Sequence, residues 1–140
     1  MKACLRSLTV VAAAAALVAG AGSMAAWAQG EWKAPADAKN TKNPLADKKA
    51  DKAALAEGKK LAETNCASCH GPEGKGNGPA AAALPPPKPA DWTSAKVQGE
   101  SDGELFWKIS NGRGPMPPWK HLSEKDRWDL VTFVKSLGKK

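Results

Sequence analysis

Cysteine, histidine and methionine are scarce in this chain, so each of them can be considered individually. The 140 residues include three cysteines, two histidines, three methionines and no tyrosine. Two of the cysteines, Cys66 and Cys69, lie close together, and His70 follows directly. A structural zinc site needs four ligands, and His121 is the only further histidine. The composition therefore disfavours a structural zinc site.

Long apolar runs are also absent, apart from one near the N-terminus. Leu8–Ala19 is almost wholly apolar, it follows the basic residues Lys2 and Arg6, and Ala26–Ala28 has the small-x-small form of a signal peptidase site. A bilayer core needs about 20 apolar residues, so this run is too short to favour the alternative of a membrane anchor. We therefore predict a cleavable signal at residues 1–28, export to the periplasm, and no stable membrane insertion after cleavage.

No segment alternates between apolar and polar residues for long enough to be a convincing strand. Helical spacing of apolar residues, together with serine caps and terminal glycines, instead predicts helices at about residues 51–65, 101–111 and 123–137. We therefore predict an all-α domain at residues 51–140, with three to five helices and long irregular loops.

Two segments outside these helices lack a helical period. Residues 29–50 are polar and rich in lysine, alanine, asparagine and proline, which predicts a flexible leader that does not join the core. Residues 71–100 are rich in proline and glycine. A loop of this length in a compact domain is usually functional or covers something, so a bound group is expected beneath it.

The pentapeptide Cys66–His70 has the Cys-x-x-Cys-His spacing of c-type haem attachment. Two thiols about one turn apart can add to the two vinyl groups of one porphyrin edge, and the next residue can bind the iron from one face. We therefore predict one covalently bound haem c, held by Cys66 and Cys69, with His70 as an axial iron ligand. A redox-active dithiol would need a βαβ setting that this sequence lacks, and a Cys66–Cys69 disulfide would close too small a loop to stabilise much.

Met116 is the candidate for the second axial ligand. It is the only methionine outside residues 1–28, and Pro115 and Pro117 flank it. Methionine is more often a core residue, but a core methionine is rarely set between prolines in a polar loop. A thioether opposite histidine raises the reduction potential, as suits an electron carrier. His121 and an open coordination position remain as alternatives.

The surroundings of the haem are predicted in less detail. The Nδ1–H group of a ligating histidine normally donates to a carbonyl or a carboxylate. The backbone carbonyls of Pro85, Pro86 and Pro87 are the candidate acceptors for His70. Four further residues are candidates to contact the propionates, to cover the haem or to belong to the core: Trp92, Asn111, Arg113 and Trp119.

From about residue 54 to residue 137, the chain resembles the class I c-type cytochromes, specifically the bacterial monohaem group. The resemblance rests on four features, which are Gly58 eight residues before Cys66, the segment Cys66–Gly71, the segment Gly114–Pro117 and the segment Asp129–Val134. It implies a cytochrome c fold in which the first and last helices cross, with Gly58 against the face that bears Leu130 and Phe133. Ala62 stands where mitochondrial-type members have an aromatic residue, and Trp128 or another large side chain is expected to fill that space.

The predicted function is one-electron transfer, not catalysis. The formal net charge is +7, and it falls to +5 once Lys2 and Arg6 leave with the signal. Lysines are spread along the chain and do not form a cluster, so nucleic acid is not an expected partner. We expect a monomer that docks transiently on other exported redox proteins. The alternatives are a dedicated electron-accepting subunit of a periplasmic dehydrogenase or reductase, and a haem protein that binds ligands after Met116 leaves the iron.

Overall fold

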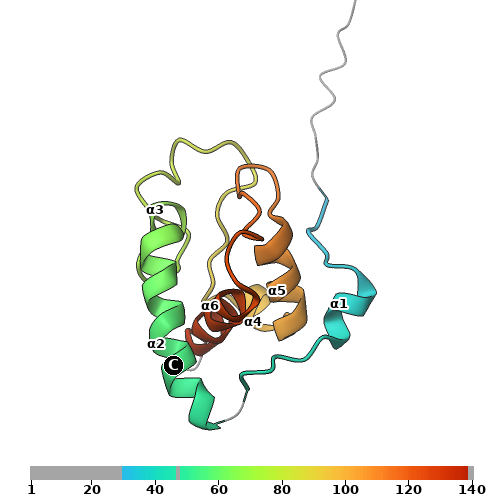
Figure 1. Cartoon of the computed structure of the whole chain (residues 1–140). Coiled ribbons are helices and arrows are strands. Elements are labelled where there is room, and N and C mark those ends of the chain that lie inside the picture. Colours follow the sequence, from blue (N-terminus) through green and yellow to red (C-terminus); the bar gives the residue numbers. More distant parts are fainter. Residues whose placement is uncertain (1–29, 47, 139–140) are drawn as a thin grey trace, which may run out of the picture.

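The computed structural model describes residues 30–46 and 48–138, so the predicted signal at residues 1–28 lies outside the described part. Six helices form there: α1 (Ala36–Asn40), α2 (Lys48–Asn65), α3 (Ala67–His70), α4 (Ala95–Gln98), α5 (Asp102–Asn111) and α6 (Glu124–Ser136) (Figure 1). The described ranges contain no strand, only an isolated bridge between Arg113 and Met116. The prediction of an all-α fold is confirmed.

The crossing of α2 and α6 is the main helix contact of the domain. Gly58 in α2 and Asp129 in α6 lie at the closest approach, where a Cβ atom on Gly58 would overlap the Asp129 carbonyl oxygen and lie 3.0 Å from Phe133 Cβ. A residue without a side chain is therefore required at this position. The implied contact between Gly58 and the face of α6 that bears Phe133 is confirmed.

The hydrophobic core has two parts, one on each side of α6. The first contains Trp128, which is 2% exposed and stacks on Phe106 with ring centroids 4.0 Å apart. The second contains Ala62, Leu130 and Phe133. The resemblance predicted that Trp128 or another large side chain would fill the space beside Ala62. Trp128 does not, because it packs in the other cluster. The small Ala62 side chain instead packs in the same cluster as Leu130 and Phe133, one helical turn along α2 from the close approach at Gly58.

Serine caps determine where α5 and α6 begin. The Ser101 hydroxyl accepts from the Glu104 backbone N–H (3.3 Å), and the Glu104 carboxylate accepts from the Ser101 N–H (2.7 Å), which is the predicted capping box. Ser123 accepts from the Asp126 N–H at 3.1 Å. Two boundaries differ from prediction, because α2 begins at Lys48 and α6 ends at Ser136, short of Gly138.

The prediction that residues 29–50 stay outside the core is wrong for residues 30–46. The helix α1 lies against α5, and Ala38 is 7% exposed (Figure 1). The side chain of Leu45 packs on the same cluster as Trp128. Asn43 donates from its amide to Asp102 Oδ2 (3.1 Å) and to Thr132 Oγ1 (3.3 Å). Only a few apolar side chains of this segment are buried, and hydrogen bonds supply the other contacts. For this reason the segment shows no apolar period in the sequence.

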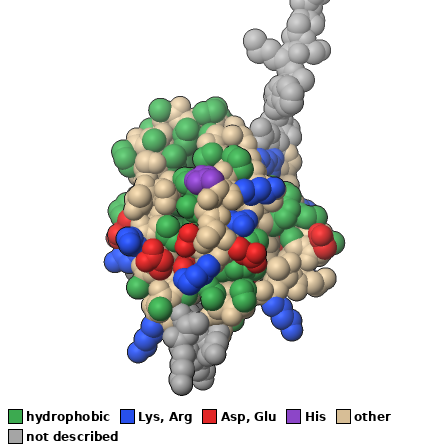
Figure 2. Space-filling model, in the orientation of Figure 1, with side chains coloured by type: hydrophobic (Ala, Val, Ile, Leu, Met, Phe, Trp, Pro, Cys, Tyr) green, Lys and Arg blue, Asp and Glu red, His purple; other side chains and the backbone are tan. Residues whose placement is uncertain are grey.

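The surface differs between the loop end of the domain and its middle. In Figure 2, acidic and basic side chains are mixed across the middle of the visible face, whereas the upper part, where the loop after α3 lies in Figure 1, shows mainly hydrophobic and uncharged atoms. Among the described residues, no helix combines the length and the apolar character needed to cross a membrane.

Candidate functional site

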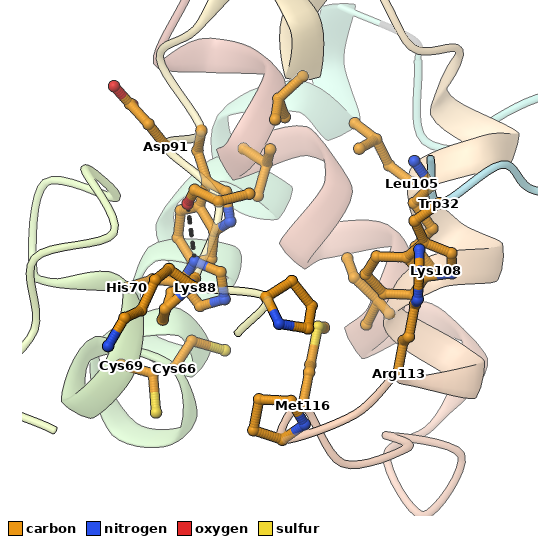
Figure 3. A pocket seen from close by; sticks show the side chains of 18 of the residues that line it. Trp32, Cys66, Cys69, His70, Lys88, Asp91, Leu105, Lys108, Arg113 and Met116 are labelled. Carbon is orange, nitrogen blue, oxygen red and sulfur yellow. Dashed lines mark hydrogen bonds between the residues drawn. The ribbon is translucent and has the colours of Figure 1, made fainter. Parts of the chain in front are cut away.

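A cavity of about 490 Å³ lies between the α2–α3 corner, the segment around residues 84–98, the helices α5 and α6, and the loop after α5. Its volume is within the range of about 300–1,000 Å³ that is usual for small-molecule and cofactor sites. Cys66, Cys69, His70 and Met116 all line it, although they are far apart in the sequence (Figure 3). The described structure thus brings the two predicted attachment cysteines and the two predicted iron ligands to one cavity.

His70 lies at the end of α3, a single helical turn that starts directly after Cys66. Its backbone N–H donates to the Cys66 carbonyl at 2.9 Å, so the imidazole and the first thiol share one turn. The imidazole stacks on Trp92, with ring centroids 4.5 Å apart and planes 24° from parallel. This packing limits rotation of the ring.

The His70 Nδ1 atom lies 3.0 Å from the Ala90 carbonyl oxygen (dashed line in Figure 3). The acceptor is therefore Ala90. The prediction that it would be Pro85, Pro86 or Pro87 is wrong. With Nδ1–H donating to Ala90, the neutral ring keeps its lone pair on Nε2, which is the form that a metal ion requires. Burial lowers the pKa of His70, and the Ala90 contact opposes this shift only in part, so the ring favours the neutral form.

Cys66 and Cys69 carry free thiols in this structure, and both are half-buried. Burial raises the pKa of the Cys66 thiol to about 11, with a smaller contribution from neighbouring Cys69. A thiol with so high a pKa stays protonated at neutral pH and is a weak nucleophile. The described residues contain no cluster of three or more His, Cys, Asp or Glu side chains that could hold a metal ion. Neither finding supports a dithiol redox site or a zinc site.

Met116 is held by a tight turn in the loop after α5. Its N–H donates to the Arg113 carbonyl at 3.1 Å, and the Arg113 N–H donates to the Met116 carbonyl at 2.9 Å. Gly112 has a positive φ of 62° and lies against the backbone of Met116 and the following residue. The thioether points into the cavity (Figure 3). His121 does not line the cavity; it is exposed, and its ring lies 5.3 Å from that of Trp119.

Three of the four further candidates, Trp92, Arg113 and Trp119, line the cavity, and Asn111 does not. The Asn111 amide instead donates to the Trp107 carbonyl within α5, at 2.8 Å. Asn111 is therefore engaged within its own helix in this structure, and its role toward the haem stays a prediction.

One wall of the cavity was not predicted from the sequence. Lys108 Nζ and Glu100 Oε1 form an ion pair at 2.5 Å, and their side chains are only 12% and 16% exposed. Trp32 lies beside this pair, with its ring centroid 5.4 Å from Lys108 Nζ and 6.0 Å from Arg113 Cζ. A tryptophan in an otherwise polar segment was the available signal, because large aromatic side chains are seldom left without a packing partner.

The composition of the wall fits the group that the pentapeptide predicts. Apolar side chains such as Leu105, Ile109 and Leu130 line the interior. Lys108 and Arg113 lie together on one side, and Lys88 and Asp91 lie on the side of His70. A porphyrin has a flat apolar body and two carboxylates on one edge. The thiols, the imidazole and the thioether are the donors that haem c uses in its attachment and ligation.

Comparisons with known proteins agree with this fit. The family model described as cytochrome c matches residues 55–138. A cbb3-type cytochrome c oxidase subunit CcoP of Azospirillum sp. (strain B510) is 35% identical over 99 residues, which covers 67% of this chain and 32% of the relative. The subunit of the same name in Azospirillum brasilense is 34% identical over 90 residues, or 63% of this chain and 30% of the relative. The chain thus spans about a third of the length of these curated relatives.

A solved structure is also similar to this chain. It is a chain of the Kuenenia stuttgartiensis reducing HAO-like protein complex Kustc0457/Kustc0458, with a TM-score of 0.56 and 35% identity. The match covers 61% of this chain and 44% of that chain.

Proposed function

Since this chain belongs to the cytochrome c family, we propose that it binds one haem c covalently and carries single electrons between exported redox proteins. The observation that supports this most strongly is the shared cavity, which is lined by Cys66, Cys69, His70 and Met116. The predicted signal at residues 1–28 supports export to the periplasm.

Each residue of the cavity has a distinct role in this proposal. Cys66 and Cys69 would hold the haem through two thioether bonds, and His70 and Met116 would bind the iron. The bound haem supplies a Fe(III)/Fe(II) couple that takes up and releases one electron. The Ala90 carbonyl fixes the orientation of the His70 ring through Nδ1–H. The turn at Arg113 holds Met116 toward the cavity.

This ligand set suits a carrier better than a catalyst. Because His70 and Met116 would both bind the iron, a substrate would have to displace one of them to reach it. The residues around the cavity are held by packing and by backbone hydrogen bonds, such as the Trp92 stack on His70, so little rearrangement is needed when the charge changes. Fast electron transfer requires little structural reorganisation of the protein. Electron carriers also dock briefly on their partners, typically through interfaces that bury less than about 1,200 Å².

The attachment is tested by acid–acetone extraction of the matured protein. The haem of the wild type is expected to stay with the protein, and the Cys66→Ala/Cys69→Ala variant is expected to release any haem that it binds. Ser68→Ala is the matched control, because Ser68 lies between the two cysteines and is exposed. If wild-type haem is extracted, or if the matured protein is colourless with two free thiols, the proposal is wrong.

A second candidate function is that of a permanent subunit of a redox complex. The names of the similar proteins favour it, since two are oxidase subunits and one belongs to an HAO-like complex. Purification at native abundance distinguishes the two functions. A free carrier elutes as a monomer in size-exclusion chromatography, whereas a subunit co-elutes with a larger enzyme and stays with it at raised salt, which screens weak electrostatic docking.

A further inference from the structure

We propose that residues 30–46 form a strap that covers one side of the haem cavity, and that Trp32 is a positioning residue that holds Lys108 and Arg113 at the cavity wall. The strap precedes the residues that the cytochrome c model matches, so the family match does not account for it. The inference rests on the proposed function, since it concerns the environment of the haem that Cys66 and Cys69 would hold.

The strap is attached to the domain at both of its ends. Near its start, Arg113 donates from its guanidinium to the Gly30 carbonyl at 2.7 Å. Near its end, Asn43 donates to Asp102 and to Thr132, and so joins the strap to α5 and α6. Between these points, Gly30, Glu31 and Trp32 line the cavity itself. The strap is therefore part of the cavity wall.

Trp32 lies close to two cations. Its ring is within about 6 Å of both Lys108 Nζ and Arg113 Cζ, the range in which cation–π attraction operates. In Figure 3, Trp32, Lys108 and Arg113 lie together, across the cavity from His70 and the two cysteines. Removal of the indole would open the wall to water and remove the cation–π contacts of Lys108 and Arg113, leaving Lys108 with its Glu100 ion pair and Arg113 with its hydrogen bond to Gly30.

Both consequences change the reduction potential in the same direction. Oxidised haem carries one more positive charge than reduced haem, so water that enters the cavity favours the oxidised form. Cations near the haem favour the reduced form, and this effect weakens when they move away. Glu100 offsets the charge of Lys108, so the change in charge comes mainly from Arg113. Glu31, the acidic residue of the strap at the cavity, lies 3.2 Å from Lys33 and 3.9 Å from Lys96, and these pairs offset its charge.

Gly103 offers a way to displace the strap without changing any cavity residue. A Cβ atom at Gly103 would overlap the Ala38 carbonyl oxygen and lie 2.6 Å from the Thr41 carbonyl oxygen, and all three of its nearest neighbours belong to the strap. Within α5 itself, alanine is a better helix former than glycine. Gly103→Ala should therefore leave α5 intact and push the strap away.

The experiment measures the midpoint potential of the haem-loaded full chain in the wild type and in the Trp32→Ala, Trp32→Phe and Gly103→Ala variants. Trp32→Ala and Gly103→Ala are expected to shift the potential downward. Trp32→Phe keeps an aromatic face for Lys108 and Arg113 and is expected to remain near the wild-type value. Limited digestion with trypsin gives an independent readout, because faster cleavage after Lys33, Lys39 or Lys42 in Gly103→Ala reports release of the strap.

The inference is overturned if the potential stays unchanged in both Trp32→Ala and Gly103→Ala while trypsin cuts the strap of Gly103→Ala faster. It is also overturned if Gly103→Ala leaves the cleavage rate unchanged, since the strap would then not depend on contact with α5. Acid–acetone extraction of each variant separates these outcomes from a failure of the proposed function, which would show as loss of covalent haem in the wild type.

Discussion

Gly58 in α2 lies directly against the backbone carbonyl of Asp129 in α6, and a Cβ atom on Gly58 would overlap that oxygen. A flexible side chain could move aside, but a helix carbonyl cannot. The two helices that frame the haem cavity therefore approach each other at a distance that only glycine permits.

Gly58→Ala tests this contact. The substitution should gain about 1 kcal/mol of helix propensity, but overpacking against a rigid backbone costs about 1–3 kcal/mol or more. We expect a net loss of up to about 2 kcal/mol in the free energy of unfolding, measured by denaturant titration. Ala56→Gly, at an exposed position of α2, calibrates the propensity difference. A Gly58→Ala variant that is more stable than the wild type would contradict the close crossing.

The capping box of α5 predicts a pH-dependent contribution to stability. Hydrogen bonds from Ser101, mainly from its backbone N–H, lower the pKa of Glu104. Because the folded pKa lies below the unfolded value of about 4.3, the stabilisation is present above pH 4.3 and is lost as the pH falls through the folded pKa.

Glu104→Gln should therefore be less stable than the wild type at pH 7, by a few tenths to about 1 kcal/mol for this solvent-screened cap. The difference should shrink as the pH falls below about 4.3 and disappear once the pH is below the folded pKa. Glu63→Gln is the control, since Glu63 is exposed and its contact with Lys59 is 3.8 Å long. Unfolding curves across pH 3–7 check both variants. An equal pH dependence in the wild type and in Glu104→Gln would contradict the role of the carboxylate.

The hydrogen bonds of Asn43 lead to a prediction of how strongly the N-terminal segment is attached to the domain. Its amide donates to Asp102 and Thr132, and its Oδ1 accepts from the Leu45 N–H at 2.9 Å. Asn43→Ala removes all three bonds, so we expect a loss of about 1–2 kcal/mol in the free energy of unfolding. Asn40→Ala, at an exposed position of α1, should change it by less than about 0.5 kcal/mol. Equal effects of the two substitutions would contradict the attachment.

Local chemistry in the sequence was sufficient to predict α5 and α6. The hydroxyls of Ser101 and Ser123 each accept a hydrogen bond from the backbone N–H three residues later. Each helix start therefore depends on residues that are only three apart. The Cys66–His70 turn is local in the same sense, because the backbone of His70 bonds to Cys66. Features that depend on a few neighbouring residues can be predicted from one sequence.

The N-terminal strap and the partner of His70 depend instead on contacts between distant segments. Ala38 packs through its backbone against Gly103, and neither residue contributes to an apolar period. The choice of Ala90 as acceptor depends on how the 71–94 loop returns to the domain, for example through the hydrogen bond from the Trp92 N–H to the Gly74 carbonyl. No pattern within the loop sequence encodes that path, so the expectation for the three prolines was wrong by a few residues.

The assignment of Met116 as the second iron ligand leads to the last prediction. Met116→Ala should lower the midpoint potential on the order of 0.1 V, because loss of the thioether removes a ligand that favours the reduced state. The haem should remain attached, since Cys66 and Cys69 are unchanged. Reduced Met116→Ala should also bind carbon monoxide at neutral pH, whereas the wild type should not.

His121→Ala is the matched control for this experiment, because His121 is exposed and does not line the cavity. Its potential and its far-red iron–sulfur absorption band should equal those of the wild type. If the wild type lacks that band, and His121→Ala changes the potential while Met116→Ala does not, the iron is bound by two histidines. Such a result would require the loop between Met116 and α6 to rearrange when haem is bound, because the observed turn points the thioether, and not the imidazole, into the cavity.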